Sequence, residues 1–130
     1  MKNKLFSGLF LITSLLIGLG AFGHASQWWK HVYPVIGSGI TDQHMLHLLL
    51  MVWLFVSACM LSFGIILVWI WWRIRKGDRN LMFVPVIIGV LYLITGVCSW
   101  FYVAPFFALF VVLGALLLIS TWALHPGRTE

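Results

Sequence analysis

Four apolar runs divide the chain, and the short segments between and around them hold all of its charged residues. The runs cover residues 5–23, 45–72, 81–101 and 105–124. Because about 20 helical residues cross the hydrocarbon core of a bilayer, each run is long enough to span it. The pattern predicts an all-α fold: an integral membrane four-helix bundle in one domain, residues 1–130. The second run exceeds the length needed, so we expect that helix to tilt or protrude.

Composition also indicates a membrane protein, and the distribution of charge predicts its orientation in the membrane. The chain of 130 residues is 62% hydrophobic and 8% charged, which is not the composition of a small soluble domain. Its net charge is +5. Most of the positive residues precede the first span, fill the turn over 73–80 or follow the fourth span: Lys2, Lys4, Arg73, Arg75, Lys76, Arg79 and Arg128.

Only Lys30 falls on the opposite side, in the outer loop predicted over residues 24–44. By the positive-inside rule, both termini and the 73–80 loop are expected to be cytoplasmic. The lipid bilayer, with its anionic headgroups, is then the expected partner of the basic segments. Nucleic acid is not expected, because it needs a larger basic face than one turn provides.

Tryptophans fall near the predicted ends of the spans, as membrane-interface anchors do. Trp28, Trp29 and Trp100 are expected at the outer boundary, and Trp71, Trp72 and Trp122 at the inner one.

Small residues at helical spacing predict where the helices pack closely. They form one stripe on the first span and another on the third: Ser14, Gly18, Ala21, Gly89 and Gly96. The first span also resembles a secretory signal peptide, with a small-x-small site at residues 23–25, before Ser26. Its apolar run is longer than a typical signal core, which favours a retained helix, although cleavage after residue 25 stays open.

Histidine is the main candidate for chemistry. His44 and His47 lie three residues apart, on one face of the second span, and His24 ends the first span at a similar predicted depth. Imidazole suits zinc, copper or haem iron, so these three residues form a candidate metal or haem site. The alternative is that the histidines only tolerate the interface, with one ring edge in water and the other on lipid or protein.

Four short segments carry a family resemblance: Gly20-Ala21-Phe22-Gly23-His24, Arg75-Lys76-Gly77-Asp78-Arg79, Gly89-Val90-Leu91-Tyr92-Leu93 and Leu113-Gly114-Ala115-Leu116-Leu117. With them the chain resembles small, mostly uncharacterised four-helix inner-membrane proteins of bacteria, and more remotely DoxX-like chains. The resemblance implies a four-helix bundle and carries no activity or catalytic residue with it.

No Asp, Glu, Lys or Arg lies within the predicted spans, which argues against a proton pump or an ion-coupled transporter. We therefore expect a non-catalytic membrane protein, either an accessory subunit that contacts other membrane subunits or a homo-oligomer. One alternative is a redox-associated protein that holds haem or copper with its outer histidines. Another is a protein that binds lipid or quinone between its helices.

Overall fold

The computed structural model describes residues 2–40, 42–102 and 105–125. Over these residues all regular structure is helical, and four segments are long and apolar enough to cross a membrane. The elements in order are α1 (Lys2–Gln27), a π-helical turn η1 (Trp28–Val32), α2 (Tyr33–Ile36), α3 (Gln43–Arg75), α4 (Phe83–Tyr102), a 3₁₀ turn η2 (Pro105–Phe107) and α5 (Ala108–Ala123). The prediction of an all-α fold with four helices of membrane-spanning length is confirmed.

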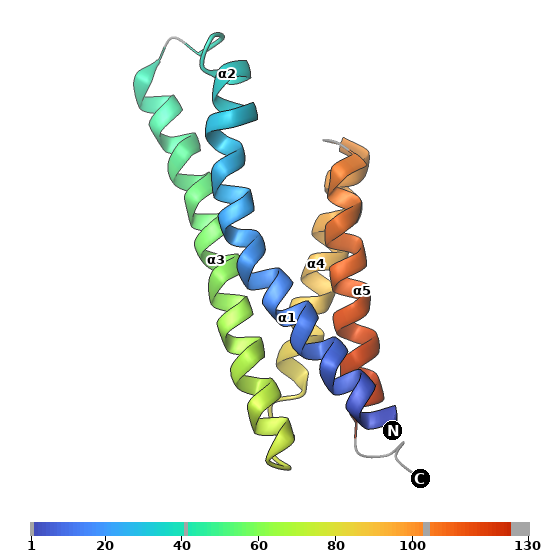
Figure 1. The fold of residues 1–130 in the computed structure, drawn as a ribbon. Coiled ribbons are helices and arrows are strands. Elements are labelled where there is room, and N and C mark those ends of the chain that lie inside the picture. Colours follow the sequence, from blue (N-terminus) through green and yellow to red (C-terminus); the bar gives the residue numbers. More distant parts are fainter. Residues whose placement is uncertain (1, 41, 103–104, 126–130) are drawn as a thin grey trace.

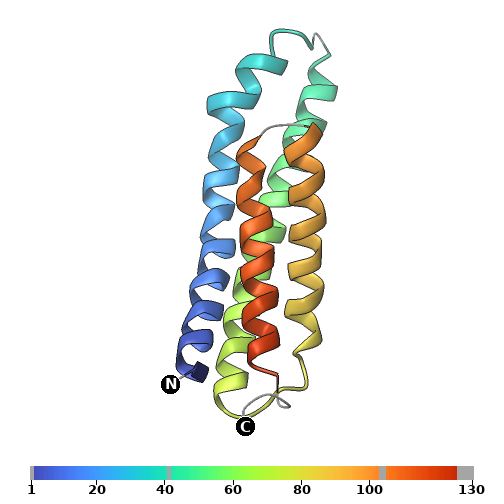
Figure 2. The same cartoon turned by 90° about the vertical axis from the view of Figure 1, so that its right-hand side faces the viewer.

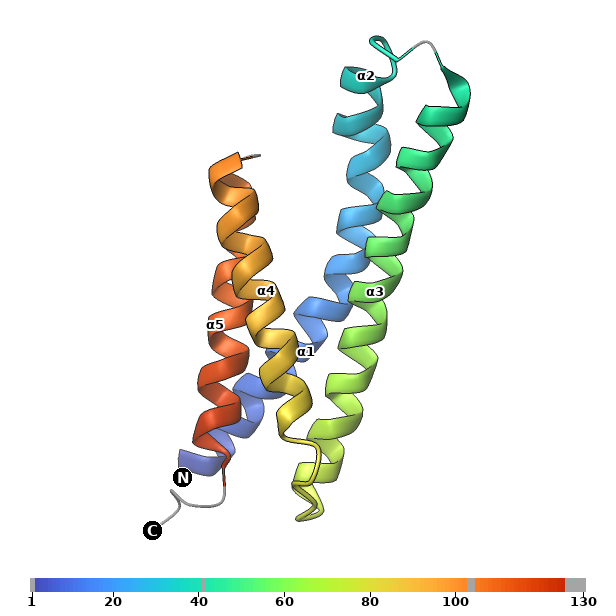
Figure 3. The same ribbon diagram turned by 180° about the vertical axis from the view of Figure 1, so that it is seen from behind.

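The helices form two antiparallel pairs, α1 with α3 and α4 with α5 (Figure 1). The pairs are joined mainly where α1 packs against α5, and they diverge toward the end of the molecule that carries α2 (Figures 1 and 3). The beginning of α1, the α3–α4 turn and the end of α5 lie together at the opposite end. We call this the basic end, because the last turn of α3 and the α3–α4 turn carry Arg73, Arg75, Lys76 and Arg79.

The α1–α3 pair is held by buried residues at intervals of three, four or seven positions, the spacing of a helix that packs along a single seam. On α3 this seam runs through Ser57, Met60, Gly64, Leu67 and Ile74. On α1 the corresponding buried residues are Phe10, Ser14, Ile17 and Ala21, and Trp28 continues the seam in η1. A long coiled-coil-like contact therefore joins the first two spans.

Glycines set how closely the helices approach in both pairs. A Cβ atom on Gly64 would lie 2.3 Å from the Cα of Gly18, so the two backbones touch at this crossing. In the second pair, a Cβ on Gly114 would lie 2.7 Å from the carbonyl oxygen of Gly89, and one on Gly96 would lie 2.6 Å from the backbone nitrogen of Val111. Ser14 is fully buried beside the first crossing and donates its hydroxyl to the carbonyl of Phe10 at 2.7 Å.

The first pair is longer than the second, as Figure 2 shows. Lys4–Ile36 and Gln43–Arg75 are 33 residues each, whereas Phe83–Phe101 and Pro105–Ala123 are 19 each. At 1.5 Å per residue these lengths correspond to about 50 Å and about 30 Å. The second pair thus matches the hydrocarbon core of a bilayer, while the first pair exceeds it.

The predicted outer loop over residues 24–44 was too long, because helix continues to Ile36. No glycine or proline lies between His24 and Tyr33 to stop α1. Pro34 falls in the first turn of α2, directly after the π-helical turn η1. The helix ends before Gly37, and Asp42 begins α3 by accepting a hydrogen bond from the His44 backbone at 2.9 Å.

The predicted turn over residues 73–80 is also displaced. α3 continues to Arg75, and α4 starts at Phe83. The chain leaves α3 through Gly77, whose φ of +87° is a conformation that glycine adopts at little cost. Arg128, which entered the prediction of orientation, lies outside the described residues.

Candidate functional site

Three polar or aromatic side chains meet where α1 and α3 pack in the wider half of the molecule. The Nδ1 atom of His24 lies 2.9 Å from the Oγ of Ser57, and the His24 ring stacks on Trp53 with centroids 4.3 Å apart. The indole N–H of Trp53 donates to the backbone carbonyl of His24 at 2.8 Å. Two hydrogen bonds and a stacked ring pair thus tie α1 to α3 at this point.

The hydrogen bonds of Ser57 are linked to the protonation of the imidazole. Ser57 donates its single hydroxyl proton to the carbonyl of Trp53, at 3.1 Å, as serine commonly does within helices. With that proton used, the Ser57 oxygen is able to accept from Nδ1–H of His24, and the other tautomer of the imidazole would instead accept the Ser57 proton. This arrangement positions the ring.

Trp28 lies next to this cluster, one helical turn after His24. It is 2% exposed and packs against Trp53 with ring centroids 6.0 Å apart. Its Nε1 is buried without a hydrogen-bond partner among the described residues. Trp28 of η1 thus packs toward Trp53 of α3, and its role as an interface anchor stays a prediction.

The three histidines predicted to form a metal or haem site are not brought together. His24 faces Ser57, whereas His44 and His47 are exposed in the first turns of α3. Ser57 follows them by 13 and 10 residues, which is about 20 Å and about 15 Å along the helix axis. Over the described residues, no three His, Cys, Asp or Glu side chains are placed to hold one metal ion. The arrangement therefore gives haem or copper binding no support.

At the basic end, three cations each lie over a tryptophan one helical turn earlier in α3. The Arg73 guanidinium lies 5.2 Å from the Trp69 ring centre, Arg75 lies 5.1 Å from Trp71, and the Lys76 ammonium lies 3.6 Å from Trp72. The spacing of four residues in the sequence could have revealed these cation–π pairs. The indole N–H of Trp71 also donates to the carbonyl of Ser7 at 3.0 Å, which ties this end of α3 to α1.

One carboxylate belongs to the same end. Asp78 accepts hydrogen bonds from Arg73, including one from its Nε at 2.8 Å, and another from the backbone of Asn80 at 3.1 Å. These bonds, led by the one from Arg73, hold the pKa of Asp78 below its usual value. The pair fixes the turn that leads from α3 into α4.

The remaining tryptophans predicted as interface anchors differ in exposure. Trp29, Trp72, Trp100 and Trp122 are each between 46% and 61% exposed, and Trp71 is half-buried. Exposed indoles at both ends of the helices are suited to the polar boundary of a bilayer.

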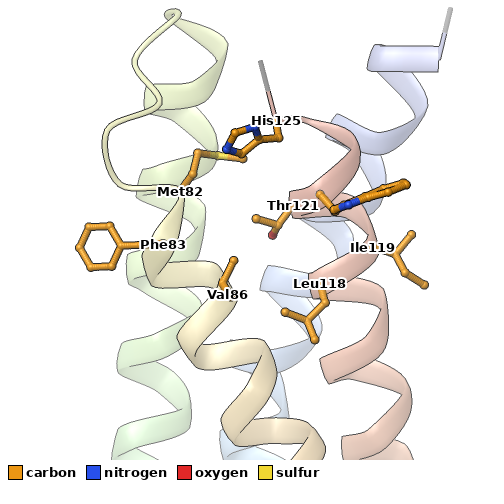
Figure 4. A pocket seen from close by; sticks show the side chains of 8 residues that line it. Met82, Phe83, Val86, Leu118, Ile119, Thr121 and His125 are labelled. Atoms are coloured by element: carbon orange, nitrogen blue, oxygen red, sulfur yellow. The ribbon is translucent and has the colours of Figure 1, made fainter. Parts of the chain in front are cut away.

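A groove of about 610 Å³ lies between the beginning of α4 and the end of α5, at the basic end. Figure 4 shows Met82 and His125 at its end and Val86 and Leu118 further along it. Its other lining residues are Phe83, Ile119, Thr121 and Trp122. Sequence reasoning missed this groove, because it depends on how α4 and α5 cross.

No protein-family model, curated protein or solved structure matches the chain. Nothing in these comparisons bears on the resemblance to DoxX-like chains, which stays a prediction.

Proposed function

We propose that this protein is a non-catalytic integral protein of the bacterial cytoplasmic membrane, with both termini in the cytoplasm. We further propose that it assembles through α3 with another transmembrane helix, either that of a partner subunit or that of a second copy. Orientation rests on the positive-inside rule, since the cations of residues 73–79 lie in the last turn of α3 and in the turn after it. Figure 1 shows that turn at the end where α1 begins and α5 ends.

One observation carries the proposed assembly: α3 has a second seam, on the side away from α1. Met51, Phe55, Ala58, Ser62 and Ile65 repeat at intervals of three and four residues, and all five are exposed. A shallow hollow lined by Met51, Val52, Leu54, Phe55 and Ala58 lies on this face. In membranes, small residues four apart on one helix, here Ala58 and Ser62, let another helix approach closely. Gly18 and Gly64 allow the same close approach between α1 and α3.

The proposal of a non-catalytic protein is supported by five hydroxyl groups that bond within their own helices. The hydroxyls of Ser14, Ser57, Ser62, Ser120 and Thr121 each donate to a carbonyl one turn earlier in their own helix. His24 is positioned by Ser57 and Trp53, as described above. These polar groups serve helix structure and packing.

Photocrosslinking in native membranes, from an introduced cysteine labelled with a thiol-reactive benzophenone, tests the assembly without needing a thiol on the second chain. Cys59 and Cys98 are free thiols, so a background of Cys59→Ala and Cys98→Ala is made first. In that background we expect Ala58→Cys to crosslink to a second protein chain, and Leu91→Cys on the exposed face of α4 to stay uncrosslinked. Equal crosslinking at both positions, or none at either, would contradict the proposal.

A further inference from the structure

We propose that the groove between α4 and α5 at the basic end is a binding site for one anionic phospholipid, with an acyl chain in the groove and the phosphate at its mouth. This inference rests on the membrane embedding proposed above. It does not depend on assembly through α3.

The interior of the groove suits a hydrocarbon chain. Its volume of about 610 Å³ is in the range of ligand pockets, and most of its lining is aliphatic or aromatic. Thr121 is one of its polar side chains, and its hydroxyl already donates to the carbonyl of Leu117 at 2.7 Å. An acyl chain makes no hydrogen bond and leaves this bond intact.

The mouth of the groove has His125 in its lining and lies close to the backbone of Arg79. His125 is exposed there beside Met82 (Figure 4). The backbone N–H of Met82 donates to the carbonyl of Arg79 at 3.2 Å, which places Arg79 one turn from the groove lining. A phosphate at the mouth would lie within the reach of an arginine side chain and of a histidine.

Charge at this end selects an anion. Among the described residues, Asp78 is the only carboxylate in the α3–α4 turn, and it already forms an ion pair with Arg73. Arg75 and Lys76 lie over Trp71 and Trp72, whereas Arg79 has no carboxylate partner among the described residues. Basic pockets between transmembrane helices on the cytoplasmic side commonly bind anionic headgroups. Charge complementarity thus favours an anionic lipid over a zwitterionic one.

The depth of the groove agrees with this occupant. It lies at the last turn of α5 and the first turn of α4, where the chain leaves the apolar helices for the basic turn. A lipid phosphate lies at the same boundary, with its acyl chains directed into the bilayer. Phosphate and acyl chain of a single molecule can then reach the mouth and the groove together.

Native mass spectrometry of delipidated protein in mild detergent, titrated with phosphatidylglycerol or phosphatidylcholine, tests the site. We expect one tightly held phosphatidylglycerol per chain, bound about fivefold or more tightly than phosphatidylcholine. Arg79→Gln should reduce binding of phosphatidylglycerol to the level of phosphatidylcholine, and Arg79→Lys should preserve the preference. Arg75→Gln is the matched control, because it also removes one positive charge from the basic end, at a side chain that lies over Trp71.

Filling the groove tests the acyl chain separately. Val86→Trp should abolish tight binding of both lipids, and Ile119→Trp replaces it as the test if circular dichroism shows that Val86→Trp does not fold. Equal affinity for the two lipids, or unchanged binding in a folded groove-filled variant, would overturn the proposal. Displacement of the lipid by inorganic phosphate alone would also overturn the proposal. So would retention of an uncharged quinone whose binding is the same in wild type and in Arg79→Gln. The same spectra report chain stoichiometry, so a failure of this site is distinguishable from a failure of the proposed assembly.

Discussion

At the scale of single residues, the bond between His24 and Ser57 is the polar contact that joins the side chains of α1 and α3 in the wider half of the molecule. Their atoms are 2.9 Å apart, and Ser57 is 6% exposed. In an apolar interior an imidazole left without a partner is costly. Ser57 therefore contributes more than the bond to its own helix, and it fixes the orientation of a ring that also stacks on Trp53.

Ser57→Ala should destabilise the folded protein by about 1 kcal/mol, because His24 loses its partner. Ser26→Ala is the matched control, since Ser26 lies outside the second seam of α3 and donates to the carbonyl of Gly23 in its own helix at 2.8 Å. Its effect should be within about 0.5 kcal/mol of zero. Unfolding in mixed detergent micelles measures both variants, and equal effects would show that the His24 contact contributes nothing.

Asp78 should make the α3–α4 turn sensitive to acid. Arg73 lowers the pKa of Asp78 in the folded protein, so the ion pair contributes its full stability above about pH 4 and loses it as the pH falls through the lowered pKa. The difference in melting temperature between wild type and Asp78→Asn should be constant above about pH 5 and shrink below about pH 4. A difference that stayed constant down to pH 3, or grew, would contradict the role of this pair.

At the scale of helices, close glycine contacts determine the register of each pair. Gly18 and Gly64 let α1 and α3 touch backbone to backbone, and this contact fixes which residues of the two seams meet. His24 reaches Ser57, and Trp71 reaches Ser7, on opposite sides of this crossing. The polar contacts therefore depend on the small residues between them.

Gly64→Ala should force α1 and α3 apart, because its Cβ would lie 2.3 Å from the Cα of Gly18 and backbone cannot yield as a side chain does. We expect a loss of about 1–3 kcal/mol in the free energy of unfolding. Gly8→Ala on α1 is the control, since its Cβ would meet no atom within 4 Å. Unfolding in detergent should separate the two variants, and equal stability would argue against a tight crossing.

Sequence alone predicted the helices well and their contacts less well. The apolar runs marked four spans, and Gly18 lies at the closest approach of α1 to α3. The extension of helix to Ile36 was missed because polar residues from His24 to Lys30 suggested a loop, although none of them breaks a helix. The burial of Trp28, the His24–Ser57 contact and the groove between α4 and α5 depend on helix register and crossing, which periodicity does not specify.

At the scale of the whole molecule, two helix pairs of different length share one end. Figures 1 and 2 show the shorter pair ending below the tip formed by α2 and the start of α3. The longer pair, at about 50 Å, exceeds the hydrocarbon core by about 20 Å. If the basic end lies at the cytoplasmic surface, then the tip with His31, His44 and His47 reaches the headgroup region opposite it.

Labelling in intact cells tests this orientation. Ser38 and Asn80 are both exposed, one in the turn after α2 and the other in the α3–α4 turn. In a background without Cys59 and Cys98, Ser38→Cys should react with a membrane-impermeant maleimide in cells whose outer membrane has been made permeable. Asn80→Cys should react only after the inner membrane is opened. The reverse pattern would show that the basic end faces outward, against the proposal.

The central claim is that this small membrane protein works in an assembly formed through the second seam of α3. Its most direct test is the mass of the particle extracted from native membranes with its surrounding lipids, for wild type and for Ala58→Trp. We expect the wild-type particle to contain at least one further protein chain, and the Ala58→Trp protein to be extracted as a folded single chain. A wild-type protein that is already a folded single chain with no companion protein would contradict assembly through α3.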